Sequence, residues 1–131
     1  MTRWLGRFEP QFYAIVRIVA GVMFALHGTA KLFGWPGTKP PAADDLLIAA
    51  GVIETATGVM VAIGYQASWA AFVASGTMAV AYFKSHAFGV SFFPTINRGE
   101  LAVLYCFLFL YIAARGAGTW SIDGNAEKRA G

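Results

Sequence analysis

The chain has 131 residues, of which 57% are hydrophobic and only 13% are charged, and its formal net charge is +3. Soluble domains carry roughly 25% charged residues, so this composition excludes a water-soluble globular enzyme. The sequence has no basic stripe, zinc-finger spacing or RNA-binding aromatic motif, which excludes the common nucleic-acid-binding classes. A chain of this length forms one domain. We therefore expect an all-α integral membrane protein that contacts the lipid bilayer.

The first apolar segment, residues 12–33, would span roughly 33 Å as a helix. Gly34 and Pro36 follow it and end the helix. The segment is about twice as long as the apolar core of a signal peptide, and it contains Arg17. We therefore expect a retained membrane span and not a cleaved leader.

Two more helices are expected at residues 46–63 and 67–83. Asp44 or Asp45 is placed to cap the first of them, and Gly64 is placed to end it. Because the connection between the two helices is very short, they must be antiparallel neighbours.

The fourth segment is the shortest, since residues 101–114 cannot cross a hydrocarbon core of about 30 Å. Extension to residues 98–117 supplies the missing length, with arginines at both ends that can reach the headgroups. Asn97 and Glu100 have the spacing of a capping box for this helix.

The expected organisation is a four-helix transmembrane bundle over residues 12–117. Residues 1–11 form an N-terminal interfacial segment, and residues 118–131 form a polar C-terminal tail that frays from about Ser121. Both termini share one side, which carries more Lys and Arg than the other, so we expect cytoplasmic termini and an inner-membrane location. All four tryptophans fall at or beyond segment ends, as in an interfacial aromatic belt: Trp4, Trp35, Trp69 and Trp120.

Two helix faces combine glycines with an ionisable residue, a pattern typical of membrane helices that approach closely. By axial rise, either Arg17 or His27 could reach Glu54 across an antiparallel pair, and Arg17–Glu54 is our candidate intramembrane ionic pair. Glu54 is then either a structural ion-pair partner or a carboxylate that binds a ligand or handles protons. The faces are Arg17, Gly21, Phe24, Gly28 and Lys31 in one helix, and Leu47, Gly51, Glu54, Gly58 and Val61 in the other.

A second polar cluster lies on the side opposite the termini. Lys31 and Lys84 have a structural explanation, because cations favour the last turn of a helix. His27 lies inside an apolar helix and needs a partner, and the nearby cations suggest an anionic or carbonyl-bearing ligand such as a quinone headgroup. The ligand-binding candidates are His27, Lys31, Tyr82, Lys84, His86, Arg98 and Glu100.

Redox chemistry within the chain is limited by its single cysteine, Cys106. One thiol forms neither an internal disulfide nor a dithiol redox pair, so electron transfer would require a bound cofactor or another subunit. We expect no metal site, because no zinc or calcium ligand pattern occurs. A haem between His27 and His86 is disfavoured, since the chain has no attachment motif and no second histidine pair.

The sequence of the first helix, RIVAGVMFALHGTAKLFG over residues 17–34, resembles the first-helix motif of the DoxX family. Weaker matches follow in order, namely GVIE at 51–54, AYFKSH at 81–86, GELA at 99–102 and GTWSID at 118–123. The whole resemblance covers about residues 12–123.

This resemblance implies a compact bundle of four membrane helices. DoxX proteins are described as oxidoreductase-associated membrane proteins, and the related DoxD proteins are subunits of a thiosulfate:quinone oxidoreductase. The resemblance therefore implies a quinone-linked oxidoreductase component or redox-partner subunit, with a quinone as cofactor. Its motif residues map to Arg17, His27, Lys31, Glu54, His86 and Glu100.

Two other functions remain as alternatives at this stage. One is a non-catalytic membrane scaffold or assembly factor whose ionic residues serve packing. The other is a small transporter, which would have to be a homo-oligomer because four short spans enclose little space. The sequence assigns no catalytic residue and no substrate.

Overall fold

The chain folds into helices. The computed structural model describes residues 3–37, 39–89 and 91–131, and over these ranges it contains six α-helices and no strand. The expected all-α class is confirmed; residues 1–2 of the expected interfacial segment lie outside the described residues. The elements in order are the 3-10 turn η1 (Gly6–Phe8), α1 (Glu9–Phe33), α2 (Asp45–Ile63), α3 (Ala67–Tyr82), the π-helical turn η2 (Phe83–Ala87), α4 (Pro94–Asn97), α5 (Glu100–Arg115) and α6 (Ile122–Ala130).

Local signals set the ends of α2. The Asp44 carboxylate accepts hydrogen bonds from the backbone N–H groups of Leu46 at 2.8 Å and Leu47 at 3.2 Å. Gly64 ends the helix with a left-handed φ of 70°, a conformation that glycine adopts without steric cost. Both expected caps are confirmed.

The expected capping box of the fourth long helix is wrong. Gly99 is the residue before α5, and no side chain caps that end among the described residues. The Asn97 side chain instead accepts from Gly99 N at 2.8 Å and donates to the carbonyl of Ser91 at 2.9 Å. Asn97 thus organises the loop before α5, and this helix starts two residues later than expected.

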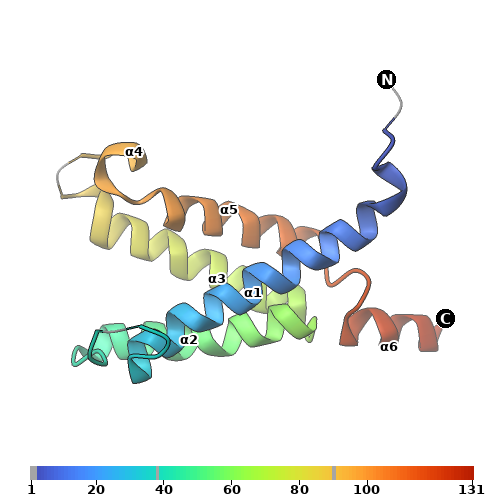
Figure 1. Ribbon diagram of the computed structural model, residues 1–131, viewed down its shortest axis with the longest axis horizontal. Coiled ribbons are helices and arrows are strands. Elements are labelled where there is room, and N and C mark those ends of the chain that lie inside the picture. Colours follow the sequence, from blue (N-terminus) through green and yellow to red (C-terminus); the bar gives the residue numbers. More distant parts are fainter. Residues whose placement is uncertain (1–2, 38, 90) are drawn as a thin grey trace.

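The long helices are arranged as two pairs (Figure 1). α1 packs along α2, α3 packs along α5, and α2 and α3 contact each other across the short turn that joins them. Both ends of the chain lie at one end of the molecule, and α4 lies at the other (Figure 1).

The α1–α2 contact is closest where glycines face each other. A Cβ atom added at Gly21 would lie 2.6 Å from the carbonyl oxygen of Gly58, and one added at Gly58 would lie 2.7 Å from that of Gly21. One added at Gly51 would lie 3.2 Å from the carbonyl oxygen of Gly28. The expected close approach of the two glycine faces is therefore confirmed, and it fixes the antiparallel register in which Gly21 faces Gly58 and Gly28 faces Gly51.

Substitution of Gly58 by alanine is expected to lower the free energy of unfolding by about 1–3 kcal/mol, because the new methyl group forces the two backbones apart. Gly76 in α3 is the matched control, since an added Cβ there meets no described atom within 4 Å. Gly76→Ala is expected to be neutral or stabilising by up to about 1 kcal/mol through its helix propensity. Thermal unfolding of both variants in detergent measures the contrast; equal destabilisation would contradict the close approach.

The C-terminal segment is better ordered than expected. Instead of a frayed tail it contains α6, whose first turn is capped by Ser121 Oγ accepting from Gly124 N at 3.0 Å. The Asp123 carboxylate accepts from the backbone N–H groups of Gln66 and Ala67, both at 3.0 Å. Asp123 thereby satisfies free donors at the start of α3 and attaches α6 to the rest of the protein.

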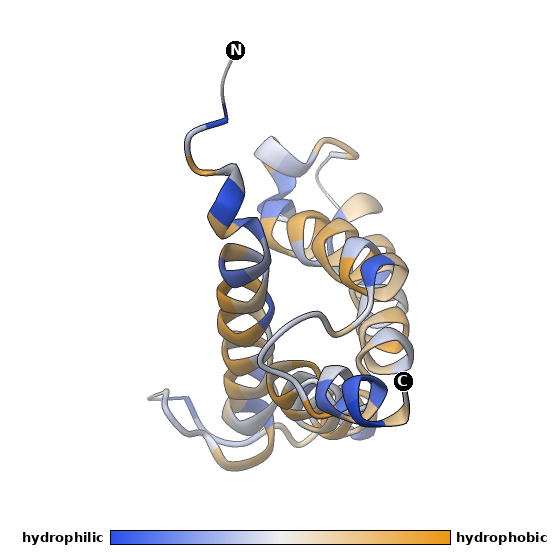
Figure 2. Cartoon of the chain, turned by 90° about the vertical axis from the view of Figure 1, so that its right-hand side faces the viewer, coloured by the Kyte–Doolittle hydropathy of each residue, from blue (hydrophilic) through white to orange (hydrophobic). Residues whose placement is uncertain are grey.

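The outside of the long helices is apolar. Figure 2, viewed from the end that carries both termini, shows hydrophobic colour along the long helices and hydrophilic colour on α6 and the N-terminal turn. Large apolar side chains point outward, such as Phe107 at 66% exposure. Two helical stretches, Gly6–Phe33 and Asp45–Ile63, are long and apolar enough to cross a membrane. α3 and α5 are shorter, at 16 residues each.

Candidate functional site

A cavity of about 550 Å³ lies between the two helix pairs, at the end of the molecule away from the termini. Its wall is formed by the C-terminal part of α1, the N-terminal part of α2, the C-terminal part of α3 with η2, and the N-terminal part of α5. Ligand-binding pockets commonly have volumes of roughly 300–1,000 Å³ and apolar walls with a few polar groups. This cavity has that character: Leu47, Ile53, Met78 and Leu101 are among its apolar wall residues.

The cavity brings together most of the ligand-binding candidates. Tyr82 and Glu100 are the two candidates that are absent from its described lining. Glu54, expected as an ion-pair residue, also lines it. The candidates that line the cavity are His27, Lys31, Lys84, His86 and Arg98.

Glu54 is paired with Lys31. The Lys31 ammonium forms a salt bridge with one carboxylate oxygen, Oε1, of Glu54. The Glu54 side chain is 1% exposed, whereas that of Lys31 is 32% exposed. The expected Arg17–Glu54 pair is therefore wrong.

The α1–α2 register explains this correction. With Gly21 facing Gly58, Arg17 lies beside the end of α2, roughly 12 Å along the axis from Glu54. Side chains of a helix tilt toward its N-terminus, so Lys31 points back toward the Glu54 side chain and Arg17 points away from it.

Arg17 instead binds four backbone carbonyls and is fully buried. Its Nη1 donates to Val61 O and Ala62 O, both at 2.8 Å, and its Nη2 donates to Thr119 O at 3.1 Å and Trp120 O at 2.8 Å. Carbonyls at a helix C-terminus lack intrahelical partners and carry partial negative charge. Arg17 thus joins α1, the end of α2 and the segment before α6, away from the cavity.

Two buried oxygen atoms on the cavity residues have no hydrogen-bond partner among the described residues: Glu54 Oε2 and the hydroxyl of Tyr105. Tyr105 was not among the residues expected to bind a ligand. Its position near the middle of an apolar helix could have indicated a site, because a buried tyrosine hydroxyl normally finds a partner. The Tyr105 ring also lies edge-on to His27, with ring centroids 6.0 Å apart.

The end of the cavity nearest the α4 loop is organised by Tyr82 and His86. Nδ1 of His86 lies 3.0 Å from the carbonyl oxygen of Asn97. Since a carbonyl only accepts, this Nδ1 carries a hydrogen and Nε2 is the other ring nitrogen available for binding. Tyr82 stacks on the His86 ring and donates its hydroxyl to Phe92 O. Tyr82 therefore holds the loop before α5 and does not line the cavity.

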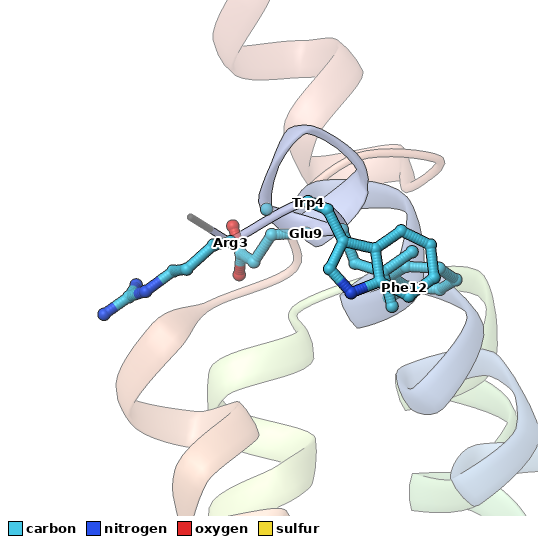
Figure 3. A pocket seen from close by; sticks show the side chains of 6 residues that line it. Arg3, Trp4, Glu9 and Phe12 are labelled. Carbon is cyan, nitrogen blue, oxygen red and sulfur yellow. The ribbon is translucent and has the colours of Figure 1, made fainter. Parts of the chain in front are cut away.

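An open surface hollow of about 360 Å³ lies at the opposite end of the molecule (Figure 3). Figure 3 shows Arg3 pointing to one side and Trp4 and Phe12 to the other. Trp4 is 79% exposed. Exposed aromatics beside a basic residue are typical of a membrane–water interface, so we assign no ligand to this hollow.

Comparison with known proteins identifies relatives of the chain. Residues 12–87, more than half of the sequence, match the DoxX family. An uncharacterized protein from Haemophilus influenzae is 42% identical over 131 residues, which cover 95% of this chain and 98% of that protein. No solved structure matches the chain.

Proposed function

This chain belongs to the DoxX family, and we propose that it is an inner-membrane four-helix protein whose cavity binds the ring of a quinone. In this proposal α1, α2, α3 and α5 span the bilayer, the termini are cytoplasmic, and the protein serves as a quinone-binding component of a redox system.

Membrane insertion is supported by the outward apolar surface and by the two long apolar helices. The shorter helices gain length at their ends, since η2 continues α3, Arg98 precedes α5 and Arg115 is its last residue. Long basic side chains near helix ends can reach the headgroup layer. Exposed tryptophans lie at both ends of the molecule, as expected for residues at the two interfaces.

The observation that carries the quinone proposal is the cavity itself, which combines an apolar wall with clustered polar groups. A quinone is a flat apolar ring with two carbonyl acceptors. Tyr105 and His27 line the cavity, and their side chains supply potential donors. Lys84 and Arg98 also line it, and their positive charge would stabilise negative charge on a reduced ring. The electron donor or acceptor for the quinone would be another subunit, since this chain has one cysteine.

The proposal predicts a specific effect of Tyr105→Phe. Adding a short-chain benzoquinone to the detergent-solubilised protein should raise its melting temperature, because a ligand that binds only the folded state stabilises it. Loss of one hydrogen bond should weaken binding by about 2- to 12-fold. The ligand-free variant should be as stable as the parent or more stable, since its buried hydroxyl has no described partner. Calorimetry and thermal unfolding measure the two effects.

Tyr111→Phe is the matched control on the same helix. Its hydroxyl accepts a hydrogen bond from Arg115 and does not line the cavity, so quinone binding should not change. Extraction of the protein with organic solvent should also release a membrane quinone. Absence of both extracted quinone and ligand-dependent stabilisation would contradict quinone binding, and a folded, monodisperse chain in buffer without detergent would contradict membrane insertion.

A non-catalytic scaffold is the second candidate. It is favoured by the structural contacts of three intramembrane ionic residues, since Arg17 binds backbone carbonyls and Lys31 pairs with Glu54. A scaffold predicts that partner-enzyme activity falls only in proportion to the amount of folded protein, whereas a quinone site predicts that Tyr105→Phe lowers activity at unchanged protein level.

A further inference from the structure

We infer that the inner end of the cavity selects a ligand with a hydrogen-bond donor, and therefore binds the hydroquinone more tightly than the quinone. This inference rests on the proposed quinone-binding function and assigns the selection to the Glu54 carboxylate.

Glu54 is the acceptor in its salt bridge with Lys31. The Lys31 ammonium donates to Glu54 Oε1. An ionised carboxylate only accepts hydrogen bonds. Glu54 therefore presents acceptors alone, one of them already used by Lys31.

Glu54 Oε2, the other carboxylate oxygen, is buried and has no hydrogen-bond partner among the described residues. The Glu54 side chain as a whole is 1% exposed. A buried charged acceptor without a donor is strongly unfavourable, so a bound molecule that donates to this oxygen gains more than one that does not.

Glu54 and Tyr105 lie deeper in the cavity wall than Arg98 and His86. Arg98 precedes α5 and His86 lies in η2, whereas Glu54 lies roughly 13 Å inside α2 and Tyr105 roughly 7 Å inside α5, counted from their first residues. The residues that carry the two unpartnered oxygens thus line the inner part of the cavity. A ligand ring placed there meets an acceptor on one wall and, on another, a hydroxyl that can either donate or accept.

These groups distinguish the two redox forms of a quinone. A hydroquinone carries two O–H groups, so it can donate to Glu54 and exchange a hydrogen bond with Tyr105. A quinone carries only carbonyl acceptors, so its oxygen would face the carboxylate without a hydrogen between them. The Glu54 contact therefore favours the reduced form, whereas the Tyr105 hydroxyl can donate to a quinone carbonyl or accept from a hydroquinone hydroxyl.

The test compares three probes on the unmodified, detergent-solubilised protein: a short-chain benzoquinone, its hydroquinone under anaerobic reducing conditions, and the dimethyl ether of that hydroquinone. The ether keeps the shape of the ring but cannot donate. We expect the hydroquinone to bind about tenfold or more tightly than the other two. The reductant is harmless, because the lone Cys106 forms no internal disulfide.

Glu54→Gln supplies the second arm, because an amide both donates and accepts. The preference for the hydroquinone should fall below about twofold in this variant, while Glu100→Gln, an exposed carboxylate outside the cavity lining, should keep it. If Glu54→Gln does not fold, the three-probe comparison decides alone. Equal or tighter binding of quinone or ether by the unmodified protein would overturn this inference and leave the proposed function standing; no binding of any probe would overturn both.

Discussion

Replacement of Lys31 by methionine is expected to destabilise the protein by about 3–5 kcal/mol, more than replacement of its partner Glu54 by glutamine. The reason is the unequal burial of the pair: the Glu54 side chain is 1% exposed and that of Lys31 is 32% exposed. Without Lys31 a buried carboxylate is left unpaired, which is strongly unfavourable. Without the Glu54 charge, Lys31 can turn toward the surface.

The double variant Lys31→Met/Glu54→Gln should recover part of the loss, with a coupling energy of about 1–3 kcal/mol. The Arg115–Glu9 salt bridge is the control, since its side chains are 29% and 53% exposed. The corresponding cycle with Arg115→Met and Glu9→Gln should give a coupling of about 1 kcal/mol or less. Denaturant or thermal unfolding in detergent measures both cycles. Equal coupling in the two pairs, or a milder loss for Lys31→Met than for Glu54→Gln, would show that burial does not govern the Lys31–Glu54 pair.

Replacement of Arg17 by methionine is expected to lower the free energy of unfolding by about 3–5 kcal/mol, because the loss of one side chain leaves four carbonyls without their shared donor. Arg17→Lys should be intermediate, since an ammonium keeps the charge but lacks the planar fork of donors. Amide hydrogen exchange should increase first in α6 and the segment before it, because Arg17 holds Thr119 and Trp120.

Arg7→Met is the control for this series. The Arg7 guanidinium lies over the Phe8 ring at 4.6 Å, on an exposed part of the N-terminal turn. Its replacement should change stability by about 0.5 kcal/mol or less. A similar small effect of Arg17→Met would mean that the carbonyl contacts contribute little to stability.

The separate positions of Arg17 and Glu54 change the functional interpretation of the intramembrane charges. If the two residues had formed the expected ion pair, that pair would have been a sufficient structural reason for both charges. Instead Arg17 binds backbone carbonyls at the end of the molecule that carries the termini. Glu54 lines the cavity, with Oε1 paired to Lys31 and Oε2 without a partner among the described residues. The cavity wall thereby retains an unused acceptor at its inner end, and our proposal for the redox form of the ligand depends on it.

Local sequence patterns determined the helical class, the ends of α2 and the faces along which α1 and α2 meet. Asp44 and Gly64 act on backbone groups a few residues away, and the spacing of Gly21 and Gly28 places them on one side of one helix whatever surrounds it. These features depend on contacts between near neighbours in the chain, so the sequence alone was sufficient to predict them. The family was recognised for the same reason, from a continuous motif.

The tertiary structure alone decided which residue of one helix meets which residue of another. Glycine contacts set the α1–α2 register. In that register Lys31 lies beside Glu54, and Arg17 lies beside the C-terminal end of α2. The packing of α3 against α5 likewise places Tyr105 in the cavity wall, and it places Tyr82 where its hydroxyl donates to Phe92 O in the loop before α4. A helical period predicts the face on which a side chain lies, but the partner of that face is fixed by non-local packing of backbones, which spacing along a single helix does not encode.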